Sequence, residues 1–140
     1  MKILLATDGS DGSLNAARHV ARLARDGLGL DVVVVHVQAP LLYIELLLPL
    51  NEEKLARLTQ EQGHQAVAPA CAVLREANVP HRVEIAAGEP VPRIIGLAAE
   101  LGADLIVMGA RGLGPVKGLF LGSVSSAVVQ LAPIPVTAVK

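Results

Sequence analysis

Five glycines fall within fifteen residues near the end of the chain, in the segment GARGLGPVKGLFLGS that runs from Gly109 to Ser123. Fixing a glycine costs more conformational entropy than fixing any other residue, so this density needs a reason. Glycines let backbone N–H groups approach a phosphate without interference from a Cβ atom. A helix beginning at the end of the segment would add unpaired N–H groups and the positive end of its dipole. The segment therefore has the chemistry of a phosphate site.

The same segment fits neither of the common nucleotide-binding fingerprints. The P-loop pattern is absent, and the glycines between Gly112 and Gly118 miss the dinucleotide fingerprint by one residue. Arg111 and Lys117 bring positive charge, and Ser123 could cap the following helix or turn its hydroxyl toward a phosphate. From the residues alone, a phosphate site and a plain glycine loop both stay open.

Buried strands and amphipathic helices alternate along the sequence. Apolar runs predict the strands, and apolar residues at a helical period predict the helices. We expect strands at 2–7, 31–38, 81–87, 104–109 and 136–140, and helices at about 11–28, 51–78, 91–101 and 123–131. Asn51 could cap the second helix, in which Pro69 predicts a kink or break near residues 65–69. The alternation predicts an α/β fold, an open five-stranded parallel sheet with helices on both faces.

Ligands of such sheets bind at the carboxyl ends of the strands, near the point where the strand order reverses. Those ends are expected at 7–8, 36–37, 86–88 and 108–109, so the glycine segment begins where a ligand is expected.

Composition narrows the class of protein. The 140 residues suit a single domain at 1–140, and 52% apolar residues with a net charge of −1 indicate a well-cored globular protein. The absence of basic runs and the scarcity of aromatic residues argue against nucleic acid. The single cysteine, Cys71, excludes an internal disulfide and suits an inert core position. No apolar run has the length of a secretory signal or membrane helix, so no membrane association and a cytoplasmic location are expected.

The glycine spacing Gly109-x2-Gly112-x9-Gly122-Ser123 resembles the signature of the universal stress protein family. Nearly the whole chain except residues 39–80 is similar to that family, in the stretches ILLATDGSDGS, VVVVHV, ADLIVMGARG and LGSVSSAVVQLAPIPVTAV. The resemblance implies a Rossmann-like adenine-nucleotide-binding fold. It also implies bound ATP, because members with the full signature typically bind it, with Mg²⁺ carried by the phosphates.

The resemblance also implies which residues touch the nucleotide. Asp8 would receive the ribose hydroxyls, the backbone of Val37 would read the adenine edge, and the helix start at Gly122 would cradle the phosphates. The full implied set is Ala6, Thr7, Asp8, Val37, Met108, Gly109, Arg111, Gly112, Gly122, Ser123, Val124 and Ser125. From the residues alone, Asp8 could instead cap the first helix, as could Ser10, or belong to a calcium loop.

The resemblance implies a homodimer formed through strand 135–139 and a regulatory or sensor role in a stress response. A slow ATP hydrolase or phosphoryl-transfer enzyme is the alternative, although no residue is identified that would orient a nucleophile, so no catalytic residue is assigned. A structural dimer without nucleotide is the second alternative. The scattered histidines predict no metal site, and His36 is interpreted as a satisfied core histidine. The apolar segment 40–50 could cover the core, form a lid or contact a second subunit.

Overall fold

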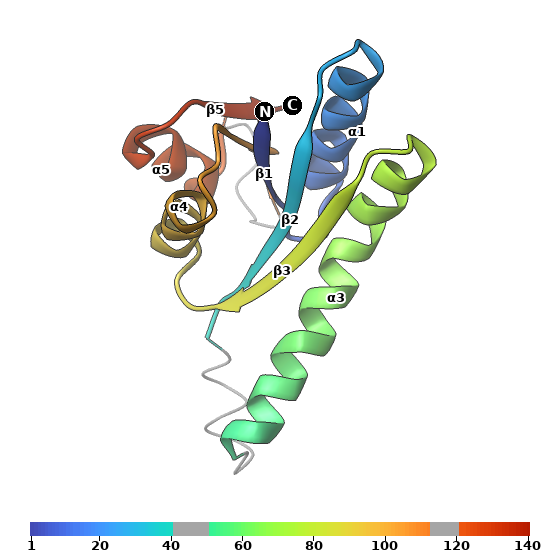
Figure 1. The fold of residues 1–140 in the computed structure, drawn as a ribbon. Helices are drawn as coiled ribbons and strands as arrows, with labels where there is room; N and C mark the ends of the chain where they lie inside the picture. Colours follow the sequence, from blue (N-terminus) through green and yellow to red (C-terminus); the bar gives the residue numbers. More distant parts are fainter. Residues whose placement is uncertain (41–50, 113–120) are drawn as a thin grey trace.

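The structure is a computed structural model that describes residues 1–40, 51–112 and 121–140. Strands and helices alternate through these residues, as the sequence predicted (Figure 1). The elements in chain order are β1 (Lys2–Ala6), α1 (Asp11–Arg25), β2 (Asp31–Gln38), α3 (Glu52–Glu76), β3 (His81–Ala87), α4 (Pro90–Leu101), β4 (Leu105–Gly109), α5 (Ser123–Leu131) and β5 (Val136–Val139).

The strands form one parallel sheet in the order β3-β2-β1-β4-β5, which confirms the predicted fold class. The order reverses at β1, which pairs with β2 on one side and with β4 on the other. The carboxyl ends of β1 and β4 are therefore neighbours, although they lie about a hundred residues apart in the chain. This is the point at which ligands of open α/β sheets bind.

Helices cover both faces of the sheet, α1 and α3 on one face and α4 and α5 on the other (Figure 1). A hydrophobic core lies on each face of the sheet, and the valine run of β2 contributes to both. Successive side chains of a strand point to opposite faces. Val32 and Val34 pack with α1 and α3, whereas Val33 and Val35 pack with α4 and α5. All four are at most 1% exposed, which explains why this strand reads as a continuous apolar run.

The predicted helix ends are confirmed where a local signal sets them. Asn51 caps α3, its side-chain oxygen accepting a hydrogen bond of 2.8 Å from the N–H of Lys54. Gly102 ends α4 in the left-handed conformation with φ of 65°, which favours glycine. The first helix ends at Arg25, before the expected Leu28, which is exposed.

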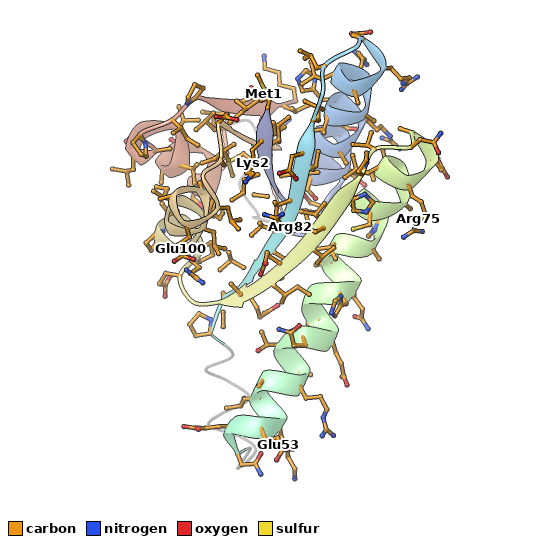
Figure 2. The ribbon with its side chains drawn as sticks, in the orientation of Figure 1. Met1, Lys2, Glu53, Arg75, Arg82 and Glu100 are labelled. Carbon is orange, nitrogen blue, oxygen red and sulfur yellow. The ribbon has the colours of Figure 1, made fainter. Side chains whose placement is uncertain are left out.

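Of the kink or break expected near Pro69, the break is wrong, because α3 is one continuous helix through that residue. Pro69 lies on the exposed side of α3, and buried residues on both sides of it, Val67 and Ala70, hold the helix against the sheet. Packing of the apolar face thus outweighs the cost of the missing backbone hydrogen bond. Figure 2 shows Glu53 near the first turn of α3 and Arg75 near its last.

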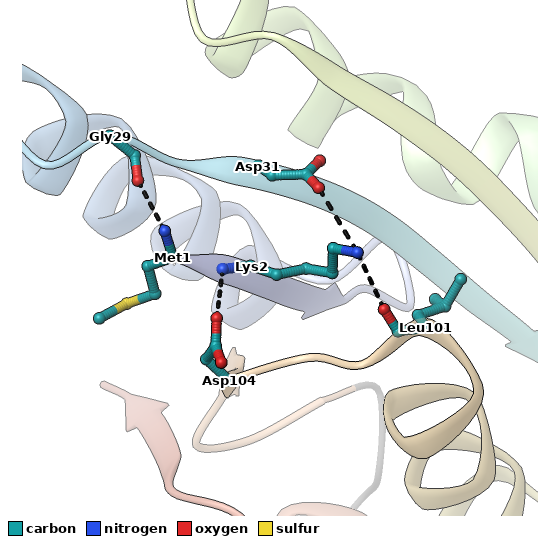
Figure 3. A network of polar contacts seen from close by, with 6 residues as sticks. All are labelled: Met1, Lys2, Gly29, Asp31, Leu101 and Asp104. Carbon is teal, nitrogen blue, oxygen red and sulfur yellow. Dashed lines mark hydrogen bonds and ion pairs between the residues drawn. The ribbon is translucent and has the colours of Figure 1, made fainter.

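Lys2 makes polar contacts with three other parts of the chain at the amino end of the sheet (Figure 3). Its backbone N–H donates to the carboxylate of Asp104 at 2.7 Å, and its ammonium donates to the carbonyl of Leu101 at 3.0 Å. The ammonium also lies 3.7 Å from the carboxylate of Asp31. Across the described ranges, no helix has the length and apolar character needed to span a membrane.

Candidate functional site

The two segments singled out in the sequence meet at the carboxyl end of the sheet. Asp8 follows β1 and Gly112 follows β4, which are adjacent strands. A Cβ atom on Gly112 would overlap the carboxylate of Asp8. A side chain at position 112 would have to displace this carboxylate, so glycine lets the loop backbone lie directly beside the acidic side chain.

The turn after β1 orients Asp8. One carboxylate oxygen of Asp8 accepts a hydrogen bond of 2.9 Å from the N–H of Ser10, two residues along the chain. Ser10 is the residue that caps α1, its hydroxyl accepting a hydrogen bond of 3.3 Å from the N–H of Ser13. Of the two candidate caps, the helix uses Ser10, and Asp8 stays outside the helix at the edge of the sheet.

A chain of buried hydroxyl groups supports this turn. Thr7 donates from its hydroxyl to the hydroxyl oxygen of Ser13 at 2.9 Å, and Ser13 donates in turn to the carbonyl of Ser10 at 2.9 Å. Thr7 is 6% exposed and Ser13 is 3% exposed, so these bonds are sheltered from water. Since buried polar groups need partners, this chain fixes the turn more firmly than exposed bonds would.

The start of α5 is attached to the end of β4. The carbonyl of Ala110 accepts from the N–H of Gly122 at 2.6 Å and from the hydroxyl of Ser125 at 2.6 Å. Gly122 is the N-cap residue and offers no side-chain cap. Ser123 is an exposed residue of the first turn, so of its two possible roles the structure excludes capping. The helix start is thus held beside β4 with its positive dipole end at the sheet edge.

Backbone packs directly on backbone where α1 meets β4. A Cβ atom on Gly109 would lie 2.6 Å from the carbonyl carbon of Gly12 and 2.9 Å from the nitrogen of Ser13. A Cβ atom on Gly12 would overlap the carbonyl oxygen of Arg111. Sequence reasoning missed Gly12, because it lies in the first turn of a helix and its contact is with a residue far along the chain.

The remaining site residues line the same end of the sheet. Ala6 and Met108 pair across β1 and β4 and are buried, whereas Val37 at the end of β2 is half-buried against the α4 face. Arg111 is exposed, and Val124 packs against the α4 and α5 core. Lys117 and residues 41–50 lie outside the described residues, so the expectations for Lys117 and for segment 40–50 stay predictions.

Two other side chains with chemically active groups, Cys71 and His36, are buried. Cys71 is buried, and burial raises the pKa of its thiol, an effect that the nearby Arg75 partly offsets. His36 is 9% exposed and has oxygen atoms near both ring nitrogens. Within the described ranges, no group of three or more histidine, cysteine, aspartate or glutamate residues is placed to hold a metal ion.

The chain matches the model of the universal stress protein family over residues 1–140. A universal stress protein of Thermus aquaticus is 42% identical over 140 residues, with 99% of this chain and 97% of the relative covered.

Solved structures match over the same length. The structure of hypothetical protein MJ0577 has a TM-score of 0.82 and 27% identity, covering 99% of this chain and 94% of its own. A universal stress protein of Archaeoglobus fulgidus in complex with dAMP has a TM-score of 0.68 and 25% identity, covering 100% of this chain and 98% of its own.

Proposed function

The chain belongs to the universal stress protein family, and from this premise we propose that it binds ATP at the carboxyl ends of β1 and β4. The observation that carries the proposal is the meeting of Asp8 with Gly112, next to the strand end to which the start of α5 is attached. A carboxylate accepts hydrogen bonds from a ribose diol, and a helix start with free N–H groups suits phosphate. The related structure that holds dAMP supports an adenine nucleotide as the ligand class.

Each part of the nucleotide has matching chemistry in this chain. The adenine would lie by Ala6 and Val37, and the ribose by Asp8 and Gly109. The phosphates would follow the glycine backbone from Gly112 toward Gly122, Ser123, Val124 and Ser125, with Thr7, Met108 and Arg111 beside them. Mg²⁺ would arrive with the phosphates and keep much of its water shell, since Mg²⁺ releases water reluctantly.

We assign the bound nucleotide a regulatory role. A ligand that binds one conformation of the segment after β4 more tightly shifts the population toward it, and a partner protein can read that change. Protection of amide hydrogens in residues 110–112 and 121–125 should therefore increase with saturating ATP, and unchanged exchange would contradict this role.

The first test is to purify the protein without added nucleotide, release small molecules with acid and identify them by chromatography. Titration calorimetry with ATP and Mg²⁺ then compares the wild type with Asp8→Ala and Asp11→Ala. Asp11 is an exposed acid three residues further along, in the first turn of α1, so it is a matched control for charge.

Asp8→Ala should weaken ATP binding at least about tenfold, as expected when charge-assisted hydrogen bonds are lost. Asp11→Ala should bind nearly as the wild type does. Equal affinities for all three proteins would contradict the assignment of Asp8, and no measurable ATP binding by the wild type would contradict the proposed function.

We also propose that the protein forms a homodimer through β5, the edge strand at 135–139. The residues of β5 itself, Val136–Val139, carry no charge and are all half-buried, and Val129 and Leu131 of the neighbouring α5 are exposed. An uncharged, open strand edge readily pairs with another chain. At the opposite edge, β3 carries two exposed charged residues on one face, Arg82 (Figure 2) and Glu84, which discourages such pairing.

A proline can block one edge without breaking the sheet. The carbonyl of Pro135 accepts a hydrogen bond from Ile106 of β4, and that of Val139 accepts one from Ala110, which follows β4. The N–H of Ala138 therefore points away from β4. Ala138→Pro should give a monomeric mass by light scattering, because it removes an outward donor. Ala87→Pro makes the same change at an outward position of β3, since the next residue, Gly88, donates inward to β2. An unchanged mass for Ala138→Pro, or dissociation by both variants, would contradict pairing through β5.

A further inference from the structure

We propose that His36 is a positioning residue that makes nucleotide affinity depend on pH, by holding the turn that carries Asp8 more firmly when its ring is protonated. The inference rests on the proposed nucleotide site. It concerns a side chain outside the implied nucleotide contacts, one that reaches the site through the backbone of Thr7.

Both nitrogens of the His36 ring face oxygen atoms. Nδ1 lies 2.8 Å from the carbonyl oxygen of Thr7, and Nε2 lies 3.2 Å from the side-chain oxygen of Gln38. The amide nitrogen of Gln38 lies 3.5 Å from the carbonyl oxygen of Ala39, and the amide oxygen faces the ring. A carbonyl oxygen only accepts, so each contact requires a hydrogen on the ring nitrogen.

A neutral imidazole carries one N–H and can satisfy only one of these oxygens, whereas the imidazolium donates to both. The bond to the Thr7 carbonyl fixes the hydrogen on Nδ1, so loss of the proton leaves the lone pair of Nε2 facing the oxygen of Gln38. The side chain of Gln38 must then turn. When the ring is protonated, both contacts are hydrogen bonds, and they join the ends of β1 and β2.

The surroundings of the ring place it on the α1 and α3 face of the sheet. His36 pairs in register with Ile85, and Ile85 lies against Gly63 of α3, so both side chains share that face. Asp8 precedes α1, and the titratable or charged groups of the two helices packed there are, in α1, Asp11, Arg18, His19, Arg22 and Arg25 and, in α3, Glu52, Glu53, Lys54, Arg57, Glu61, His64, Cys71, Arg75 and Glu76. Asp11, Glu61 and His64 are exposed, and Glu84 of β3 lies on the opposite face by strand alternation.

The sign of the effect follows from charge and geometry together. Protonation adds a positive charge under the turn that holds the Asp8 carboxylate, beside the site proposed for an anionic nucleotide. It also adds the hydrogen bond from Nε2 to Gln38, which holds the ring that donates to the carbonyl of Thr7, the residue before Asp8. Affinity for ATP should therefore rise as the pH falls, and binding should be accompanied by proton uptake.

The experiment measures the dissociation constant of ATP with Mg²⁺ for wild type and His36→Asn from about pH 8 to about pH 5.5, the range in which histidine ordinarily titrates. The amide of asparagine can donate to the Thr7 carbonyl in place of Nδ1 but does not titrate. Because both proteins bind the same ligand, the ratio of their affinities removes the titration of the ATP phosphates. That ratio should change by at least about fivefold across the range, the low end for coupled sites.

Three further variants keep the test specific. Gln38→Glu, which places a carboxylate opposite Nε2, should move the midpoint of the change to higher pH, and Gln38→Leu should reduce its size. His64→Asn removes an exposed histidine of α3 and should leave the profile unchanged. Nitrogen-15 NMR of the imidazole should show the Nδ1–H tautomer above the midpoint and both nitrogens protonated below it.

Two outcomes would overturn the inference by itself. One is ATP binding with an affinity ratio that stays constant with pH, and the other is a profile that His64→Asn abolishes. No ATP binding at any pH would overturn the nucleotide site and this inference with it.

Discussion

The two ends of the parallel strands are built from different chemistry. At the amino end, charged groups pair with each other and with carbonyls. The ammonium of Met1 donates to the carbonyl of Gly29 at 2.9 Å, and the ammonium of Lys2 donates to the carbonyl of Leu101 at 3.0 Å (Figure 3). At the carboxyl end, backbone packs on backbone at Gly109, and Asp8 lies beside Gly112.

This difference shows how one fold separates stability from binding. At the amino end the cations bind the carbonyls that end helices and turns, so the contacts close on themselves. At the carboxyl end the helices begin, and their N–H groups and positive dipole ends face outward. Because the glycines there have no side chains, backbone segments pack directly on one another at Gly109 and the backbone of Gly112 lies beside Asp8. Substitutions at the amino end should therefore affect stability alone, whereas those at the carboxyl end should also lower ATP affinity.

The largest effect is expected from Gly109→Val. The new side chain would overlap the backbone of Gly12 and Ser13, which cannot move without displacing α1. Overpacking of this kind should lower the free energy of unfolding by at least about 3 kcal/mol and abolish ATP binding. Urea denaturation and calorimetry measure the two quantities.

The matched control is Gly29→Val at the amino end. A Cβ atom on Gly29 meets no other atom within 4 Å, so the same substitution should leave ATP affinity unchanged and change stability little. Comparable losses in the two variants would show that the two ends do not differ in tolerance to side chains.

A smaller effect is expected from Ser125→Ala. The variant removes the hydroxyl that donates to the Ala110 carbonyl, although the N–H of Gly122 still donates to that oxygen. A loss of about 1 kcal/mol in unfolding free energy is expected, the usual net value of one hydrogen bond. ATP affinity should fall several-fold, because the start of α5 is held less firmly beside β4.

Ser126→Ala is the control for that change, as it truncates the next residue of the same turn. Thermal denaturation and ATP titration of both variants should separate them. If Ser126→Ala weakened binding as much as Ser125→Ala does, the bond to Ala110 would not be the cause.

Local signals made most of the fold predictable. The valine run of β2, the capping side chain of Asn51 and Gly102 each act within a few residues, and the elements follow them closely. Pro69 was misjudged because its effect depends on the packing of α3 against the sheet, which local pattern does not contain.

The site was predictable only in part, because its contacts are long-range. The strand-end positions and the family resemblance pointed to Asp8 and to the glycine segment, and the order of the strands brings the two together. Nothing in the local sequence signals that Gly12 packs on Gly109, or that His36 reaches the carbonyl of Thr7. Such contacts follow from how α1 and β2 lie on the sheet, so they emerge only with the fold.

The smallest effect is expected at Lys2. Lys2→Met keeps the apolar stem but removes the ammonium that bonds to Leu101 and lies 3.7 Å from Asp31. Both charged groups are partly exposed, so the unfolding free energy should fall by under about 1 kcal/mol, and less at high salt. ATP affinity should not change, because Leu101, Asp104 and Asp31, which Lys2 contacts, lie at the opposite end of the strands from the proposed site. A loss of ATP affinity larger than the loss of stability explains would mean that the two ends are coupled through β1, and the division between them would fail.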